Sequence, residues 1–359
     1  MNNIVSVIIP VGKNEKESSY MRTIQSLFDT THDEIEILFM ADGWVPNKNL
    51  FKNYPQVKIV SSEKNEGQRV QGNRGAEIAK GDYIFRIDSH CKMSEGWDKK
   101  LKESCREKTV LVCVIEPLIE ETWKPKNGSY TFVYLTPSGE DKWWGNYPLK
   151  NKKETVQPTM CLTGCGWFCR KDYYLEHIKF DETLGKWGGI GLEVALKVEA
   201  SGGELLLHKD VRCGHLFNTN SKGYPVSVVT KTRKKILERY HKFLYNRAQK
   251  FMPVPSWENV KDDYLNDWES YFMYNTDVTR QDKTEVKDAK GNVIKKVIKY
   301  YKPVPYKGKE NPDIPEVGNR ITKNAKIEKI KIAELVNGNW KFTTLETKNE
   351  IDMYLFENE

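Results

Sequence analysis

The sequence predicts an α/β protein with a mixed, mainly parallel sheet, helices on both faces and a small β-rich module at the C-terminus. Across the first hundred residues, short apolar runs alternate with segments of helical spacing, as in parallel strands joined by right-handed crossovers. After about residue 276 the sequence shifts to alternating, Lys-rich runs with hairpin turns. A chain of 359 residues with 38% hydrophobic content can build more than one core.

Four strands and two helices are expected in the first hundred residues. The strands are short apolar runs that end at turn or polar residues, at 4–9, 35–40, 57–60 and 83–87. Apolar residues recur at helical spacing from Met21 to Phe28, after Ser18 or Ser19 as a candidate N-cap. A second helix is expected over 67–80, ending at Gly81.

The middle of the chain is less regular. Residues 110–115 form another apolar run, but most of 105–160 is rich in Trp and Pro and is interpreted as an irregular insertion or flap. Helical spacing returns from Leu192 to Ala200, where Ser201-Gly202-Gly203 should end the helix, and a strand is expected over 204–207.

A basic segment follows, from Lys231 to Lys250, in which Glu238 is the only acid. Its apolar residues recur at helical spacing, so we expect an amphipathic helix with one packed and one solvated face. Such a helix would also place a basic ridge beside any neighbouring cleft. The net charge of +7 is common for solvated surfaces and leaves a polyanionic partner as an alternative.

The C-terminal residues predict two hairpins, at 286–294 and 336–340, and an alternating strand at 326–332, with a Pro-rich link at 302–315 between the hairpins. We therefore divide the chain into an α/β domain at 1–225, a basic amphipathic helical segment at 226–275, and a small β module at 276–359.

The sequence predicts a cytoplasmic protein with no membrane span. No stretch approaches the roughly 20 apolar residues that a spanning helix needs, and the N-terminus leads into a strand without a signal-like segment. The seven cysteines, an odd number, contain no CxxC pair. We expect them to be free, buried thiols.

Polar or small residues follow three of the predicted strands. They are Pro10-Val11-Gly12-Lys13-Asn14-Glu15, Ala41-Asp42-Gly43 and Asp88-Ser89-His90. In doubly wound sheets, ligands bind beyond the carboxyl ends of the strands. The convergence predicts a site there for a nucleotide-like ligand.

Asp88 and His90 are also candidate ligands of a divalent cation, Mn²⁺ or Mg²⁺, because a carboxylate and an imidazole supply the O and N donors that such ions take. An Asp-x-His pair arises by chance in many chains, so a third ligand is needed. His215 is the candidate; considered alone, it would be interpreted as a hydrogen-bonded core histidine. The three together predict a metal site.

Two blocks of sequence surround the candidate ligands. The first runs from Asn65 to Trp97 and contains Arg74-Gly75-Ala76 and Asp88-Ser89-His90-Cys91; the second runs from Gly164 to Phe217 and contains Trp187-Gly188-Gly189 and Gly214-His215-Leu216-Phe217. Together they resemble the polypeptide N-acetylgalactosaminyltransferases, a family of GT-A-fold glycosyltransferases. The resemblance covers roughly residues 4 to 220. It implies a GT-A, Rossmann-like fold, a UDP-sugar donor, and Mn²⁺ held by Asp88, His90 and His215.

The resemblance also implies roles for single residues. Asp42 would face uridine, Arg74 keeps the arginine that precedes Gly-Ala, and Trp187 would border the sugar-phosphate pocket. Glu193 would lie at the sugar or acceptor edge, where it could act as a general base if the reaction were inverting. The remaining residues expected to bind the donor are Pro10, Val11, Ser89 and Gly188; the residues expected to act in catalysis are Asp88 and Glu193.

The chain also departs from the family pattern. Ile190 replaces the first glutamate of the Trp-Gly-Gly-Glu motif, and Val70 and Gly72 stand where the family has arginines, with Arg69 one position off. We expect neither an N-terminal membrane anchor nor a ricin-like lectin domain. The donor sugar and the acceptor therefore stay open.

The function predicted is metal-dependent transfer of a sugar from a UDP-sugar to an acceptor hydroxyl, with retention expected from the resemblance. A glycan, a protein or a hydroxymethylated DNA base could be the acceptor. For DNA, aromatic residues near the basic segment could stack on bases; these are Tyr240, Tyr245, Trp257 and Trp268. The alternatives are a catalytically silent sugar- or nucleic-acid-binding module and a nucleotidyltransferase.

Overall fold

The computed structural model describes residues 3–126, 133–136, 139–143, 154–217, 226–251, 281–289, 291–301, 327–336 and 339–358. It divides into two compact units, Met1–Ala248 and Gln249–Glu359. This boundary falls inside the predicted 226–275 segment, and the three-part division stays a prediction. Within the described ranges, no helix combines the length and the apolar character needed to cross a membrane.

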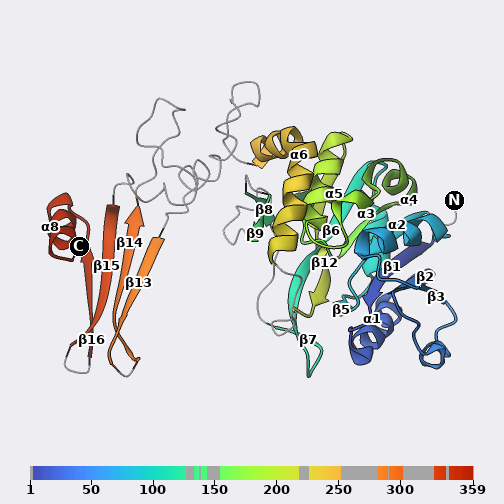
Figure 1. The fold of residues 1–359 in the computed structure, drawn as a ribbon, viewed down its shortest axis with the longest axis horizontal. Helices are drawn as coiled ribbons and strands as arrows, with labels where there is room; N and C mark the ends of the chain where they lie inside the picture. The colour runs from blue at the N-terminus through green and yellow to red at the C-terminus, as the bar shows by residue number, and fades with distance from the viewer. Residues whose placement is uncertain are drawn as a thin grey trace. The chain divides into compact units, whose positions relative to one another are not determined.

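The first unit is built on one large mixed sheet of ten strands (Figure 1). Its main path runs β10-β12-β6-β11-β4-β1-β2-β3, while β5 pairs with β12 and β7 with β6. The strands are β1 (Val5–Gly12), β2 (Ile35–Asp42), β3 (Val57–Ser61), β4 (Tyr83–Arg86), β5 (Cys91–Met93), β6 (Thr109–Ile119), β7 (Lys124–Pro125), β10 (Val156–Pro158), β11 (Trp167–Arg170) and β12 (Glu204–His215).

Parallel pairing dominates the N-terminal half of this sheet. β1 pairs in parallel with both β2 and β4, and β2 with β3. The sheet becomes mixed because β11 runs antiparallel between β4 and β6, while β6 and β12 are again parallel. The predicted α/β fold class is confirmed, together with the strands expected near 4–9, 35–40, 57–60, 83–87 and 110–115.

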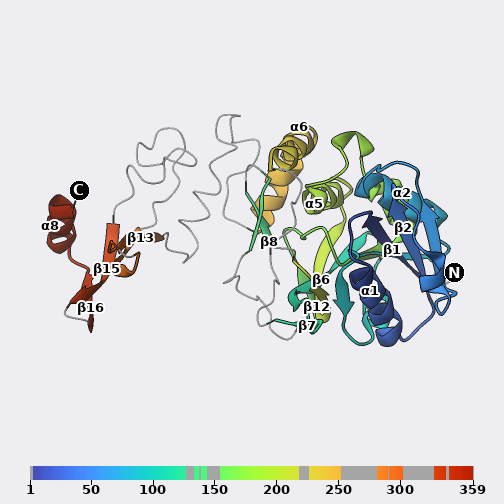
Figure 2. The same ribbon diagram turned by 60° about the horizontal axis from the view of Figure 1, so that its bottom comes forward.

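Helices cover both faces of the sheet (Figure 2). Alternate β1 residues such as Val7 and Ile9 join a core cluster that includes residues of α1 (Glu17–Thr30) and α3 (Trp97–Ser104). Ile8 points the other way, since strand residues alternate in direction. It lies so close to Gly75 of α2 (Gln68–Ile78) that a Cβ at Gly75 would meet the Ile8 Cγ2 at 2.7 Å.

The expected N-cap of α1 is wrong. The helix begins at Glu17 after Lys16, which makes no side-chain cap hydrogen bond. Ser19 lies inside the helix and is buried, so its position in the core outweighs the capping preference of serine.

The segment between β11 and β12 is mainly helical and belongs to the first unit. Three short helical turns lead into α5 (Ile190–Ala200). They are α4 (Lys171–Tyr173), the π-helical η2 (Tyr174–Ile178) and the 3₁₀ turn η3 (Glu182–Leu184). The predicted helix end is confirmed, because α5 stops at Ser201 and Gly202 has φ +68°. Another 3₁₀ turn, η1 (Lys48–Phe51), links β2 to β3.

Part of the predicted flap lies among the described residues as a two-stranded sheet of β8 (Val133–Leu135) and β9 (Asp141–Trp143). Trp144 and Pro148 of this flap lie outside the described residues, as do Trp257, Trp268 and the Pro-rich 302–315 link.

The predicted amphipathic helix is α6 (Val226–Phe251). Its packed face contains Ile236, Leu244, Tyr245 and Ala248, each at most 2% exposed. Tyr245 is thus a core residue, as the interpretation of α6 as a packed helix requires.

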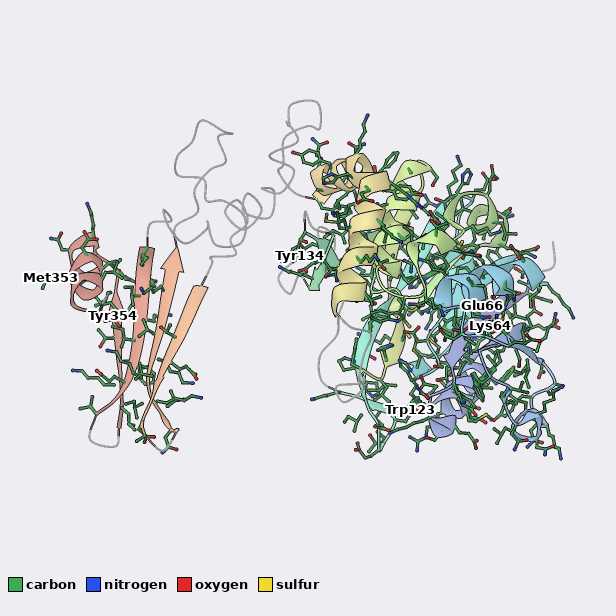
Figure 3. All side chains as sticks on the ribbon, in the orientation of Figure 1. Lys64, Glu66, Trp123, Tyr134, Met353 and Tyr354 are labelled. Carbon is green, nitrogen blue, oxygen red and sulfur yellow. The ribbon has the colours of Figure 1, made fainter. Side chains whose placement is uncertain are left out.

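The second unit contains a four-stranded antiparallel sheet in the order β13-β14-β15-β16. Its elements are β13 (Gln281–Lys287), β14 (Val293–Tyr301), β15 (Ile327–Val336), β16 (Asn339–Leu345) and α8 (Lys348–Asn358). Val297, Ile330 and Ile351 form its core, against which Tyr354 packs, whereas Met353 on α8 is 64% exposed (Figure 3). Both predicted hairpins are confirmed, and α8 was not predicted.

Candidate functional site

A cleft of about 600 Å³ lies at the carboxyl ends of β1, β2 and β4. Turns before α5 and the residues that end β12 complete its walls. Most of the sequence-predicted site residues line it: Pro10, Val11, Asp42, Asp88, Ser89, His90, Trp187, Gly188 and His215. The topology therefore brings distant segments of the chain to one edge of the sheet.

Asp88, His90 and His215 converge in this cleft. Their candidate ligand atoms all lie within 4.8 Å of one another, and His215 Nε2 is 3.1 Å from Asp88 Oδ2. The two imidazole rings meet edge to face with centroids 4.8 Å apart. β12 makes this possible, because it pairs with β5 in a register that sets His215 opposite Cys91.

Arg86 fixes the carboxylate of Asp88 from the buried side of the cleft. Its buried guanidinium donates hydrogen bonds to Asp88 Oδ1, to the Gly164 carbonyl at 2.9 Å and to Gln68 Oε1 at 2.6 Å. Burial would raise the pKa of Asp88, but the charge of Arg86 and the contact with His215 outweigh burial and hold that pKa well below its usual range. Asp88 is therefore ionised at neutral pH.

Glu15 holds His90 in a similar way. Its Oε2 lies 3.1 Å from His90 Nδ1, which leaves Nε2 as the nitrogen available to a ligand. Burial lowers the pKa of His90, yet the hydrogen bond with Glu15 and the charge of Asp88 raise it above the ordinary histidine value.

The donor set fits a divalent cation of the manganese class. One carboxylate and two imidazoles provide hard and borderline ligands, and Asp88 and His90 each have a partner that orients the group or sets its charge. The chain could hold such an ion with Asp88, His90 and His215, the ligand set expected from the sequence.

Asp42 lines the cleft but uses its oxygens to hold the loop that precedes α2. It accepts hydrogen bonds from Asn65 Nδ2, Gln71 Nε2 and the backbone N–H groups of Glu66 and Gly67, at 2.7–2.9 Å. Gly67, with φ +92°, has no room for a side chain, because a Cβ would lie 2.4 Å from Lys186 Cβ. Asp42 therefore shapes the wall of the cleft between β2 and α2.

Trp187 and Gly188 form the opposite wall. The Trp187 side chain is 36% exposed, and Gly188, with φ +90°, runs close to α6, where a Cβ would lie 3.4 Å from Val229 Cα. An exposed indole beside the candidate metal ligands is suited to cover a flat or sugar-like ligand.

Comparison with known proteins agrees with this architecture. Residues 6–177 match the model of glycosyl transferase family 2. The fold is similar to that of a solved structure, the crystal structure of GalNAc-T7 with UDP, GalNAc and Mn²⁺. The two structures superpose with a TM-score of 0.57 and are 18% identical in sequence, over 96% of this chain and 72% of that chain. The chain has a GT-A fold.

The sequence relatives agree with that assignment. Polypeptide N-acetylgalactosaminyltransferase 5 of Caenorhabditis elegans is 28% identical over 58% of this chain and 36% of its own length. Polypeptide N-acetylgalactosaminyltransferase 12 of Homo sapiens is 27% identical over 57% and 38%. The GT-A chain thus spans less than half the length of these relatives, and the resemblance inferred from its motifs is confirmed.

Two predicted residues do not reach the cleft of the GT-A domain. Arg74 lies on α2 and pairs with Glu66 at 2.8 Å, so its guanidinium is engaged at the side of the helix. Glu193 is fully buried, 2.8 Å from Arg69 Nε and 2.9 Å from Lys197 Nζ. These placements do not support donor binding by Arg74 or a general-base role for Glu193.

Sequence reasoning missed Arg86 as part of the GT-A site, and it placed Glu15 in a segment at the site without predicting its contact with His90. Arg86 stands in an otherwise apolar and aromatic strand, and a charge in a buried strand is itself a signal that a partner is nearby. Nothing in the local sequence pairs Glu15 with His90, 75 positions away; only the adjacency of the ends of β1 and β4 does so.

Proposed function

We propose that this GT-A protein is a metal-dependent glycosyltransferase that moves a sugar from a UDP-sugar to an acceptor hydroxyl with retention of configuration. The observation that carries the proposal is the cluster of Asp88, His90 and His215 at the carboxyl edge of the sheet, inside a cleft of about 600 Å³. The resemblance to the polypeptide N-acetylgalactosaminyltransferases supports the reaction class.

Asp88, His90 and His215 would hold Mn²⁺ or Mg²⁺, and such an ion, when bound, supplies a positive charge that stabilises a departing diphosphate. The crystal structure of GalNAc-T7 with UDP, GalNAc and Mn²⁺ supports this pairing of donor and metal. The chain's own part is to fix the ligands: Arg86 keeps Asp88 ionised, and Glu15 orients His90.

The state of the carboxylates in the cleft favours a reaction that retains the anomeric configuration of the sugar over one that inverts it. An inverting reaction needs a carboxylate free to take the proton of the acceptor. Among the described residues that line the cleft, Glu15 and Asp42 are hydrogen-bonded within the fold, Asp88 belongs to the metal set, and Asp141 lies 3.4 Å from Arg233. In a retaining reaction a phosphate oxygen of the donor can take that proton instead.

A glycan or a protein is the acceptor that we favour over DNA. The relatives are named as polypeptide transferases. On α6, Arg233 pairs with Glu140, Arg239 with Asp181, and Arg247 with Glu199. Three of the eight Lys and Arg residues of 231–250 are therefore paired within the fold, which leaves fewer cations for phosphate contacts than the sequence implies.

A panel of UDP-sugars with Mn²⁺ tests the proposal by following UDP release with peptide, glycan and hydroxymethylated DNA acceptors. We expect UDP release that requires Mn²⁺ and rises with one acceptor class, and an unchanged anomeric configuration in the product by NMR. Metal-dependent UDP binding without any turnover would instead identify a silent binding module. Pyrophosphate release from a nucleoside triphosphate and a sugar phosphate would identify a nucleotidyltransferase.

The predicted cytoplasmic location is also a proposal. All seven cysteines are free in the structure, which supports a reducing compartment, because disulfides are rare there. Fractionation of cells that express a tagged chain, with glycosylation-dependent markers of the secretory pathway, tests it.

A further inference from the structure

Three buried cysteines lie next to the proposed metal ligands, on the side of the protein core, and the proposed transfer reaction uses none of them. Cys91 belongs to β5, Cys213 to β12, and Cys165 to the turn that precedes β11. Each is at most 3% exposed. The Sγ atoms of Cys91 and Cys165 are 3.5 Å apart, and the Cys213 side chain is buried in the same core cluster.

His215 joins this group from the same strand as Cys213. One of its nitrogens lies within 4.8 Å of the sulfurs of Cys91 and Cys165, which in turn lie that close to each other. His215 Nε2 faces Asp88, whereas Nδ1 is buried and has no hydrogen-bond partner among the described residues. A buried ring nitrogen without a partner is costly unless something binds it.

The spacing of the sulfurs matches a tetrahedral thiolate site. Zinc binds cysteine sulfur at about 2.3 Å, which places two sulfurs of a tetrahedron about 3.8 Å apart. The 3.5 Å separation of Cys91 and Cys165 is close to that value. The backbone N–H of Asp88 also donates a hydrogen bond to the Cys165 sulfur at 3.3 Å, which stabilises negative charge on that sulfur.

We propose that Cys91, Cys165 and His215, with Cys213 as the fourth ligand once its side chain turns toward the ion, form a second metal site, selective for a soft divalent cation of the zinc class. It lies back to back with the set of Asp88, His90 and His215 and shares His215 with it. Three thiolates and one imidazole match the ligands that zinc prefers, whereas Mn²⁺ prefers oxygen donors. Binding displaces one proton from each of the three thiols and leaves the oxidation states unchanged. When both sites are occupied, His215 bridges the two cations as an imidazolate and releases its ring proton as well.

The shared histidine links the two sites. A cation bound to the sulfurs fixes the orientation of the His215 ring. The ring then either points a nitrogen at the first cation, which strengthens Mn²⁺ binding, or turns away from it, which weakens Mn²⁺ binding. In both cases zinc changes the affinity of the protein for Mn²⁺.

Titration of the fully reduced, metal-free full chain with Co²⁺, a spectroscopic substitute for zinc, tests the proposal. We expect one equivalent to produce an intense near-ultraviolet thiolate-to-cobalt charge-transfer band, and one equivalent of Zn²⁺ to remove it. Cys165→Ser should weaken Co²⁺ binding at least tenfold. Cys169→Ser is the matched control, because Cys169 is an equally buried, free cysteine in β11 outside the cluster, and it should keep the band.

Two further variants separate this proposal from the transferase proposal. Asp88→Asn should retain the band while losing Mn²⁺-dependent UDP binding, since it alters only the first ligand set. Cys91→Ser should lose the band, with circular dichroism verifying that the variant is folded. The proposal is overturned if the wild-type chain gives no thiolate charge-transfer band, or if Cys165→Ser and Cys91→Ser, both folded, titrate like the wild type.

Discussion

At the scale of single residues, the proposed metal ligands depend on neighbouring side chains that contact and orient them. Arg86 and Glu15 each touch a proposed metal ligand, and neither was predicted as a site residue. Asp88 and His90 could be predicted because an Asp-x-His pair is a local pattern, and His215 because it lies in the second block that resembles the family. Their supporting partners could not, because those contacts depend on which strand ends lie side by side.

Removing a metal ligand should abolish the metal-dependent step. We expect Asp88→Asn and His215→Ala to lose Mn²⁺-dependent UDP binding and UDP-sugar hydrolysis, because each variant loses one of the three donors in the cleft. Isothermal titration with UDP and Mn²⁺ measures the first effect. His177→Ala, a histidine outside the cleft, is the control. Unchanged turnover in either ligand variant would contradict the metal assignment.

Glu193 belongs to a buried charge network. Its oxygens accept hydrogen bonds from Arg69 Nε at 2.8 Å, from the Asp181 backbone N–H at 2.7 Å and from Lys197 Nζ at 2.9 Å. Arg69 in turn donates to the carbonyls of Gly185 and Gly188. The network therefore ties α2 and α5 to the turn that carries Trp187.

We expect Glu193→Gln to lower the free energy of unfolding by about 3–5 kcal/mol, because it leaves Arg69 and Lys197 without a buried counter-charge. Turnover at a temperature well below the melting point should change less than twofold. Glu176→Gln, at an exposed carboxylate, should leave both quantities unchanged. A large fall in kcat with normal stability would restore Glu193 as a catalytic base.

At the scale of elements, periodic segments could be predicted from the sequence and their ends could not. β12 was expected only over 204–207 but runs from Glu204 to His215. The reason is a register shift between His208 and Arg212, which breaks the alternation on which the prediction rests. The missed part of the strand is the part that carries His215.

A local signal for α8 was present but was not used. Thr347 and Glu350 form a reciprocal capping box: Glu350 Oε2 accepts from the Thr347 backbone N–H at 3.0 Å, and Thr347 Oγ1 accepts from the Glu350 N–H at 3.3 Å. The pattern Thr-x-x-Glu before an apolar run predicts a helix start.

Packing of α5 against the segment at 159–164 depends on Gly191. A Cβ at this position would lie 1.9 Å from the Leu162 carbonyl oxygen. We expect Gly191→Ala to displace α5, to lower the melting temperature and to weaken UDP binding, because residues of α5 and Leu162 line the same cleft. Differential scanning fluorimetry with and without UDP measures both effects.

Gly202→Ala is the comparison for that experiment. It introduces a side chain that meets nothing within 4 Å but at φ +68°, so only backbone strain of about 1 kcal/mol is expected. Equal effects of the two substitutions would show that the close approach of α5 to Leu162 is unimportant.

For the whole molecule, the sequence predicted the fold class and the existence of a C-terminal antiparallel module. It could not predict that α6 packs against the α/β core so closely that its arginines are largely paired. Composition shows the charges of a segment, but not which acids a long-range fold places beside them.

Stability of the whole molecule should depend on pH through His208. This imidazole is 2% exposed, and burial lowers its pKa below the ordinary value, with Lys100 adding to the shift and Asp210 opposing it. The unfolded chain therefore binds a proton more tightly, so the free energy of unfolding should fall as the pH drops below about 6.5.

Urea denaturation at pH 7 and pH 5 measures this contribution. His208→Gln should show a smaller loss of stability between the two pH values than the wild type, whereas His177→Gln, which removes a histidine outside the core, should match the wild type. An identical pH dependence in His208→Gln would exclude His208 as its source.

The long separation between Asp88 and His215, 127 positions along the chain, has a consequence for biosynthesis. A growing polypeptide exposes the proposed ligands Asp88 and His90 early but lacks the third proposed ligand until β12 has emerged and paired with β5. Cation capture therefore cannot guide the early steps of folding, and a chain truncated before His215 should leave the ribosome without the ability to acquire its ion.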